Sequence, residues 1–142
     1  MPNELVIDCS VAAKWILPEP DRELAMQYLD QWQSGTIILL APDILLAEIA
    51  SLLAKKHRRK ELTAQQAIDA YGFITAFAPK LEPSPNLMPL ALNLSLQHQV
   101  SLWDATYLAL AIQKNCPLVT ADIRLFRGGK ARHQAISLLT SL

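Results

Sequence analysis

Short apolar runs alternate with amphipathic stretches along the whole 142-residue chain, and this alternation restricts the fold more than any other feature. The run at residues 36–41 (TIILLA) is typical: it is β-branched and apolar, as strands buried on both faces are. The stretch 21–32 has apolar residues at helical spacing. Strands that alternate with helices predict an α/β fold with a parallel, doubly wound sheet. We expect about five strands, helices on both faces in a three-layer sandwich, and a single domain over 1–142.

The boundaries of the expected elements follow from apolar spacing and from capping residues. The expected strands are 5–7, 36–41, 80–82, 118–121 and 135–139. The expected helices begin at Ser10 and continue as 21–32, 42 to the basic run, 63–77, 87–97 and 102–114. We expect Asp21 to cap one helix, Pro42 to open another at its favoured first position, and Thr63 to start a capping box. Gly128–Gly129 indicates a loop before the last strand.

Composition and charge exclude several classes of protein. Lys and Arg together number 13, as do Asp and Glu, so no overall positive field indicates nucleic-acid binding. Cys9 and Cys116 form no CxxC and no disulfide framework, which fits free thiols in a reducing cytoplasm. The short apolar run before Asp8 is not a signal peptide, and no apolar run reaches the roughly 18 residues of a membrane span.

The chain is more apolar than one core of this size requires. Hydrophobic residues make up 51% of it, and its mean hydropathy is +0.19. The N-terminal helices carry several large apolar residues, namely Trp15, Leu17, Leu29 and Trp32. We therefore predict a homodimer that buries part of this surface.

Four carboxylates lie where the chain otherwise favours apolar or small residues, and two of them follow strands. Asp8 comes directly after the first strand, and Asp122 nearly directly after the strand at 118–121. Ligands of open α/β sheets bind beyond the carboxyl ends of the strands, so both side chains are candidates for a site there. The alternative is that each only caps the helix that follows it.

The other two carboxylates lie within helices. Glu48 interrupts an apolar stripe that includes Ile44 and Leu52, and no Lys or Arg lies at helical spacing to pair with it. The alternative is a surface position at the border of the stripe. Asp104 lies in an apolar helix, where we expect it to face a cavity, although with Ser101 it also fits a capping box.

Taken together, the four acids predict a metal site. Four carboxylates at one sheet edge without a basic partner repel one another, and a divalent cation relieves that repulsion. Oxygen ligands select Mg²⁺ or Mn²⁺, and such a site suits hydrolysis of a phosphodiester bond. Ser10 and Thr120 lie two residues from Asp8 and Asp122, where each hydroxyl can hold a carboxylate or a water.

The same residues resemble those of a known family over residues 5 to about 126. The patterns are an Asp and a hydroxyl residue after the first strand, a Glu in the helix after the second, a D-A-x-Y-L-A-L-A helix, and T-x-D after the fourth strand. They are Asp8 with Ser10, Glu48, Asp104, and Thr120 with Asp122. The chain resembles a PIN-domain ribonuclease, in particular the VapC-type toxins. The resemblance implies an Mg²⁺- or Mn²⁺-dependent endoribonuclease that cleaves RNA and that a small cognate antitoxin inhibits.

Two basic patches are candidates for contact with RNA phosphates. One is the run 55–60 (KKHRRK), with Lys55, Lys56, Arg58 and Arg59, and the other contains Arg124 and Arg127 beside Asp122. The alternative for the first patch is that it only complements the dipole at the end of its helix.

Two other functions compete with a nuclease. A receiver-like phosphorylation module also binds Mg²⁺ with acids on a five-stranded α/β fold. Modules of this kind have paired acids after the first strand and an acceptor Asp after the third. This chain has neither. The second alternative is a PIN-like domain that acts only as a binding partner. Loss of one of the four acids would favour it, and none is lost.

Overall fold

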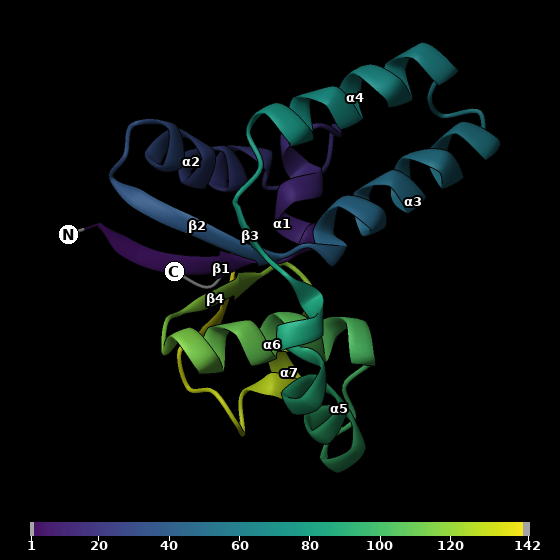
Figure 1. The fold of residues 1–142 in the computed structure, drawn as a ribbon. Coiled ribbons are helices and arrows are strands. Elements are labelled where there is room, and N and C mark those ends of the chain that lie inside the picture. Colours follow the sequence, from purple (N-terminus) through teal and green to yellow (C-terminus); the bar gives the residue numbers. More distant parts are fainter. Residues whose placement is uncertain (1, 141–142) are drawn as a thin grey trace.

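The fold is a five-stranded parallel sheet between helices, and the computed structural model describes it for residues 2–140 (Figure 1). The strand order is β3-β2-β1-β4-β5, and every pair is parallel. The strands are β1 Asn3–Ile7, β2 Ile37–Pro42, β3 Lys80–Glu82, β4 Leu118–Thr120 and β5 Ile136–Leu138. This confirms the predicted parallel, doubly wound α/β sheet.

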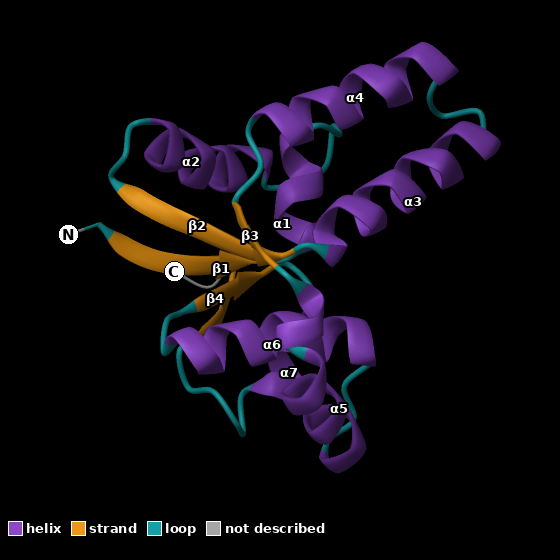
Figure 2. Ribbon diagram, viewed as in Figure 1, coloured by secondary structure: helices purple, strands orange, loops and turns teal. Residues whose placement is uncertain are grey.

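Helices cover both faces of the sheet, which confirms the three layers (Figure 2). Helices α1, α2 and α3 lie on one face and α5, α6 and α7 on the other, while α4 packs against α3 and the two form an arm that projects from the sheet (Figure 1). The helices are α1 Cys9–Ala12, α2 Arg22–Gln33, α3 Ile44–Arg58, α4 Ala64–Ala76, α5 Met88–Gln97, α6 Leu102–Lys114 and α7 Ile123–Gly129. Two short 3-10 turns, η1 Ala13–Trp15 and η2 Ser84–Asn86, lie between them. No helix of the described residues is both long and apolar enough to cross a membrane.

The core lies on both sides of β1, and α6 is its most buried helix. Residues 105–111 of α6 are all buried, because this helix packs against β1, β2 and α5. Trp15, Leu17 and Leu29 are also core residues, and half-buried Trp32 donates its Nε1–H to the carbonyl of Ala78. The surface from which we expected a homodimer is therefore used inside the chain, and the homodimer stays a prediction without that support.

One expected helix start and one expected helix cap are wrong. Pro42 is the last residue of β2, where it pairs with Glu82 of β3, and α3 begins two residues later. Proline is tolerated there because β2 is ending and its missing N–H is not needed within the strand. Asp21 precedes α2, but it has φ 64° and its side chain makes no capping hydrogen bond. The capping box predicted at Thr63 and Gln66 is confirmed, with both hydrogen bonds formed.

Gly128–Gly129 is not a loop, because both residues end α7, a helix that the sequence analysis missed. A Cβ on Gly128 would lie 2.6 Å from Cγ2 of Val100, so only glycine permits this approach of α7 to the segment before α6. A Cβ on Gly129 would lie 3.1 Å from Cδ1 of Ile136. The glycines therefore serve close packing, which fixes α7 and the residues that begin it.

The strand order changes direction at β1, which places the carboxyl ends of β1 and β4 side by side. Val6 and Ile7 pair with Leu118 and Val119, so both strands end at the same level. Asp8 follows β1 directly, and Asp122 lies two residues after β4. This junction is the position at which doubly wound sheets bind ligands.

Candidate active site

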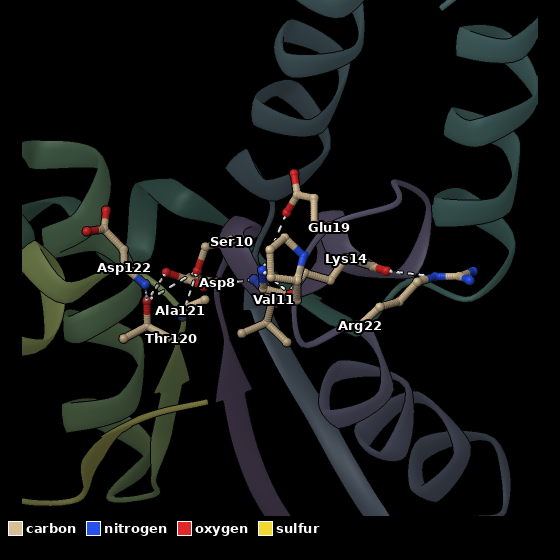
Figure 3. A network of polar contacts seen from close by, with 10 residues as sticks. Asp8, Ser10, Val11, Lys14, Glu19, Arg22, Thr120, Ala121 and Asp122 are labelled. Carbon is tan, nitrogen blue, oxygen red and sulfur yellow. Dashed lines mark hydrogen bonds and ion pairs between the residues drawn. The ribbon is translucent and has the colours of Figure 1, made fainter. Parts of the chain in front are cut away.

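Asp8 is held by two hydroxyl groups, one from Ser10 in α1 and one from Thr120 at the end of β4 (Figure 3). The Ser10 hydroxyl donates to Oδ1 of Asp8 at 2.6 Å, and the Thr120 hydroxyl donates to Oδ2 at 2.5 Å. The backbone N–H of Val11 also donates to Oδ1, so Asp8 caps α1 as well. Of the two roles considered for Ser10 and Thr120, the structure shows the hydrogen bonds to a carboxylate.

Backbone groups in turn orient the two hydroxyls. The N–H of Ala121 donates to Oγ of Ser10 at 2.8 Å, and the N–H of Asp122 donates to Oγ1 of Thr120 at 2.9 Å (Figure 3). Each hydroxyl accepts a hydrogen bond from a backbone N–H after β4 and donates its own hydrogen bond to Asp8. The arrangement therefore ties the end of β1 to the end of β4 through one carboxylate.

Asp8 is nevertheless an unfavourable place for a negative charge. The residue is only 4% exposed, and burial raises the pKa of its carboxyl group to about 6, against the three hydrogen bonds, which lower it. The charge of Asp104 raises the pKa further. No Lys or Arg within residues 2–140 forms an ion pair with Asp8.

Glu48 has a partner that the sequence analysis did not identify. The hydroxyl of Tyr107, a buried residue of α6, donates to Oε1 of Glu48 on α3 at 2.5 Å. Burial raises the pKa of Glu48, the Tyr107 hydrogen bond lowers it, and the charge of Asp104 raises it. The partner of Glu48 is thus a neutral donor distant in sequence, and the negative charge remains uncompensated.

Asp104 and Asp122 lie at the starts of α6 and α7, and both are half-buried. Burial raises the pKa of Asp104, and the charge of Asp122 raises it further, whereas Ser101 and Arg124 lower it. The cap of α6 is Ser101, whose hydroxyl accepts from the Asp104 N–H at 3.1 Å. Asp122 caps α7 by accepting from the Arg124 N–H, and its carboxylate lies 4.0 Å from Nε of Arg124. Capping is therefore one role of Asp8 and Asp122, but not of Asp104.

Asp104 links the four acids electrostatically. Its charge acts on Asp8 and on Glu48, and the charge of Asp122 acts on it. In the described part of the chain, no three His, Cys, Asp or Glu side chains already surround one metal position. The chemistry of the donors still fits a divalent cation, because all four are carboxylates, and burial and a neighbouring acid raise the pKa of Asp8, Glu48 and Asp104. A cation between them would relieve this repulsion.

The two cysteines are free thiols, as expected. Cys9 follows Asp8, and burial, followed by the charges of Glu48 and Asp8, raises the pKa of its thiol. Burial raises the pKa of Cys116 to about 11. Both groups stay protonated at neutral pH, so neither is a thiolate nucleophile.

The two basic patches lie at different distances from the acids. Lys55, Lys56 and Arg58 lie in the last turn of α3, at the far end of the arm that α3 forms with α4, followed by Arg59 (Figure 1). Lys56 is paired with Glu61 at 3.4 Å. The second patch lies on α7, where Arg124 adjoins Asp104 and Asp122 and Arg127 is one turn further on. The structure therefore brings Arg124 to the acids and leaves the first patch apart from them.

Tyr107 is the residue of this site that the sequence analysis missed. The signal was present in the spacing, since Asp104 and Tyr107 are three residues apart and therefore neighbours on one helix face. Tyrosine in an apolar helix is usually a core residue, and nothing in the local sequence indicates that its hydroxyl reaches α3. Only the tertiary fold brings the pair together, because α3 and α6 lie on opposite faces of the sheet.

Comparison with protein families decides the classification. The model of the PIN domain family matches residues 5–131, which include all four acids. The chain belongs to the PIN domain family. It is 32% identical over 124 residues to Ribonuclease VapC3 of Pyrobaculum aerophilum. The matched region covers 86% of this chain and 92% of that protein.

Solved structures show the same PIN fold at low sequence identity. One is a VapC20 from Mycobacterium tuberculosis described as a toxin that cleaves the sarcin–ricin loop, with a TM-score of 0.64 and 18% identity over 87% of this chain and 93% of that one. Another is a toxin–antitoxin complex from Klebsiella pneumoniae, with a TM-score of 0.62 and 15% identity over 97% and 99% of the two chains. These likenesses agree with the observed sheet and helical layers.

Proposed function

We propose that this protein is a metal-dependent endoribonuclease and the toxin of a toxin–antitoxin pair. The observation that carries the proposal is the set of Asp8, Glu48, Asp104 and Asp122, which are coupled through Asp104. Within residues 2–140, Arg124 is the only basic residue that acts on any of them. The similarity to Ribonuclease VapC3, over 86% of this chain, supports RNA as the substrate. A receiver module would require an acceptor Asp after β3, where Pro83 stands.

The four acids would hold Mg²⁺ or Mn²⁺, which when bound activates water and stabilises the leaving oxygen of a phosphodiester. Asp8 is fixed in orientation by Ser10 and Thr120, so it presents its carboxylate without a search among rotamers. Tyr107 does the same for Glu48. Outer hydrogen-bond partners of this kind orient metal ligands and raise affinity.

Cleavage of RNA by matched proteins tests this proposal. Wild type and Asp104→Asn, purified by the same protocol, are incubated with labelled RNA in EDTA and then with excess Mn²⁺ or Mg²⁺. We expect internal cleavage by wild type only with metal, and none by the variant. Equal cleavage by both proteins, or cleavage that EDTA does not stop, would contradict the proposal and indicate a contaminating nuclease.

The antitoxin partner is a second part of the proposal, and an apolar groove on the α3–α4 arm supports it. The groove measures about 270 Å³, and Ile68 at its edge is 65% exposed. Its lining residues are Ala50, Leu53, Ala54, Ala67, Ile68 and Tyr71. We expect an antitoxin segment to place apolar side chains there and to direct an Arg at the carboxylates, since Glu48 lies on the same helix.

The antitoxin part is tested separately from catalysis. The protein encoded by the neighbouring reading frame should inhibit cleavage, and Ile68→Lys should weaken that inhibition while leaving cleavage unchanged. A complex in which the partner leaves all four acids open to solvent would contradict this mode of inhibition.

A further inference from the structure

Trp103 is a tryptophan that the fold does not use. The indole N–H of Trp15 donates to the carbonyl of Ala25 at 2.9 Å, and that of Trp32 is bonded as well. Trp103 is 57% exposed, and within residues 2–140 its ring makes no hydrogen bond, ring contact or cation–π contact. Single exposed apolar residues are common, so the position of this ring decides what it means.

The position of Trp103 is fixed next to the acids. It is the second residue of α6, between the capping Ser101 and Asp104, and the Ala105 N–H donates to the Ser101 carbonyl at 2.8 Å. Tyr107, four residues later, lies on the same helix face and reaches Glu48 of α3. Trp103 therefore lies on the same side of α6 as Tyr107, one turn nearer the start of the helix, and directly precedes Asp104.

A polar cleft adjoins the same turn of α6. Its volume is about 250 Å³, and its lining residues are Gln99, Val100, Ser101, Asp104 and Arg124. The Arg124 side chain is 91% exposed, so its guanidinium is accessible to a phosphate while it stays near Asp122. The first turn of α6, with Trp103 and Asp104, thus lies beside the start of α7, where Arg124 is close to Asp104 and Asp122.

We propose that Trp103 is a stacking platform for one unpaired RNA base next to the scissile phosphodiester, with Arg124 binding a neighbouring phosphate. This subsite rests on the proposed ribonuclease function. Aromatic rings bind bases of single strands and loops, whereas the bases of a duplex are already stacked on one another.

The competing occupant of this surface is a protein, since exposed tryptophan is also common at interfaces. Leu92 and Leu96 on α5 are exposed apolar residues that would extend such an interface. Adjacency to Asp104 and Arg124 favours RNA, because a protein interface does not require an aromatic ring beside charged groups. The two occupants predict different outcomes for the same variants.

The test compares Trp103→Ala and Trp103→Phe with Leu96→Ala, which truncates a 77% exposed side chain of α5. The substrate is a short unpaired ribo-oligonucleotide with Mn²⁺. Loss of one stacked base predicts that Trp103→Ala raises KM roughly 5- to 150-fold. Trp103→Phe should have a KM close to that of wild type, and Leu96→Ala should have the wild-type KM. All three variants should have the melting temperature of wild type.

Two readouts separate failure of this subsite from failure of the ribonuclease proposal. Binding of the same oligonucleotide in EDTA should quench tryptophan fluorescence in wild type but not in Trp103→Ala, whether or not cleavage occurs. Equal KM values for wild type and Trp103→Ala, or equal quenching, would overturn the platform while leaving the nuclease intact. A fall in molecular mass by light scattering in both Trp103→Ala and Leu96→Ala would overturn it in favour of a protein interface.

Discussion

The two halves of the acidic site differ in how firmly the fold holds their carboxylates. The inner half is Asp8 with Glu48, whose oxygens receive hydrogen bonds from Ser10, Thr120 and Tyr107. The outer half is Asp104 with Asp122, which cap or begin helices and share the exposed Arg124. The inner half is therefore preorganised by neutral donors, whereas the exposed guanidinium of Arg124 partly balances the charge of the outer half. Separate residues therefore orient the carboxylates and compensate their charge.

The largest expected effect comes from removing one charge in the outer half. Asp104→Asn should abolish cleavage, a loss above the 10- to 100-fold that outer-shell partners cost. It should not destabilise the metal-free protein, because it relieves repulsion while Ser101 still caps α6. The unfolding free energy of wild type should rise by about 2.7 kcal/mol at a Mn²⁺ concentration one hundredfold above its dissociation constant. The variant should lose most of this gain. Thermal melts with and without Mn²⁺ check this, and a clearly destabilised variant that still responds to Mn²⁺ would contradict it.

The inner half should give the metal-free protein a stability that falls as pH rises. Asp8 titrates near 6 in the folded protein and near 3.8 when unfolded. Between these values the folded state binds more protons, so its free energy of unfolding falls from about pH 4 to about pH 6. The difference of about two pH units corresponds to about 3 kcal/mol.

Chemical denaturation in EDTA across this pH range measures the effect. The difference in unfolding free energy between wild type and Asp8→Asn isolates it, since the variant keeps the other titrating groups. Parallel profiles for the two proteins would mean that burial of Asp8 does not perturb its titration.

Removing the donor of Glu48 should have an intermediate effect. Tyr107→Phe keeps the buried ring and deletes only the hydroxyl that orients Glu48. We expect Mn²⁺ affinity and cleavage to fall about 10- to 100-fold, as for other outer-shell partners. Metal titration followed by melting temperature checks affinity independently of cleavage. Tyr28→Phe, at the opposite end of the strands, is the matched control and should match wild type.

The smallest effect is expected for Arg124, the counter-charge of the outer half. Exposed ion pairs contribute at most about 1 kcal/mol, so Arg124→Gln should lower metal-free stability by less than that. The difference should disappear at high salt, where exposed charges are screened. Melting at low and high ionic strength measures it, with Arg127→Gln as control. A loss that persists at high salt would place Arg124 in the packing of α7 instead.

The sequence predicted the sheet and indicated the four acids as candidate site residues, because both depend on local patterns. Strands in a parallel sheet are continuous apolar runs, and acids directly after them, such as Asp8, are visible in one dimension. Residues fixed by packing were not predictable in this way. Gly128 allows α7 to approach Val100, and the Tyr107 hydroxyl meets Glu48 across two helices, so both roles arise only from tertiary contacts.

The hydrogen bond between Asp8 and Thr120 joins residues 112 positions apart, which has a consequence for a chain still being made. The first acid emerges from the ribosome early, but its partner strand is synthesised only after more than one hundred further residues. Closing so long a loop is slow and comes late in folding. A nascent or truncated chain without β4 therefore carries Asp8, Glu48 and Asp104 but lacks Thr120 and Asp122, so its site is not assembled. We therefore expect that the protein cannot cleave RNA while the ribosome is still synthesising it.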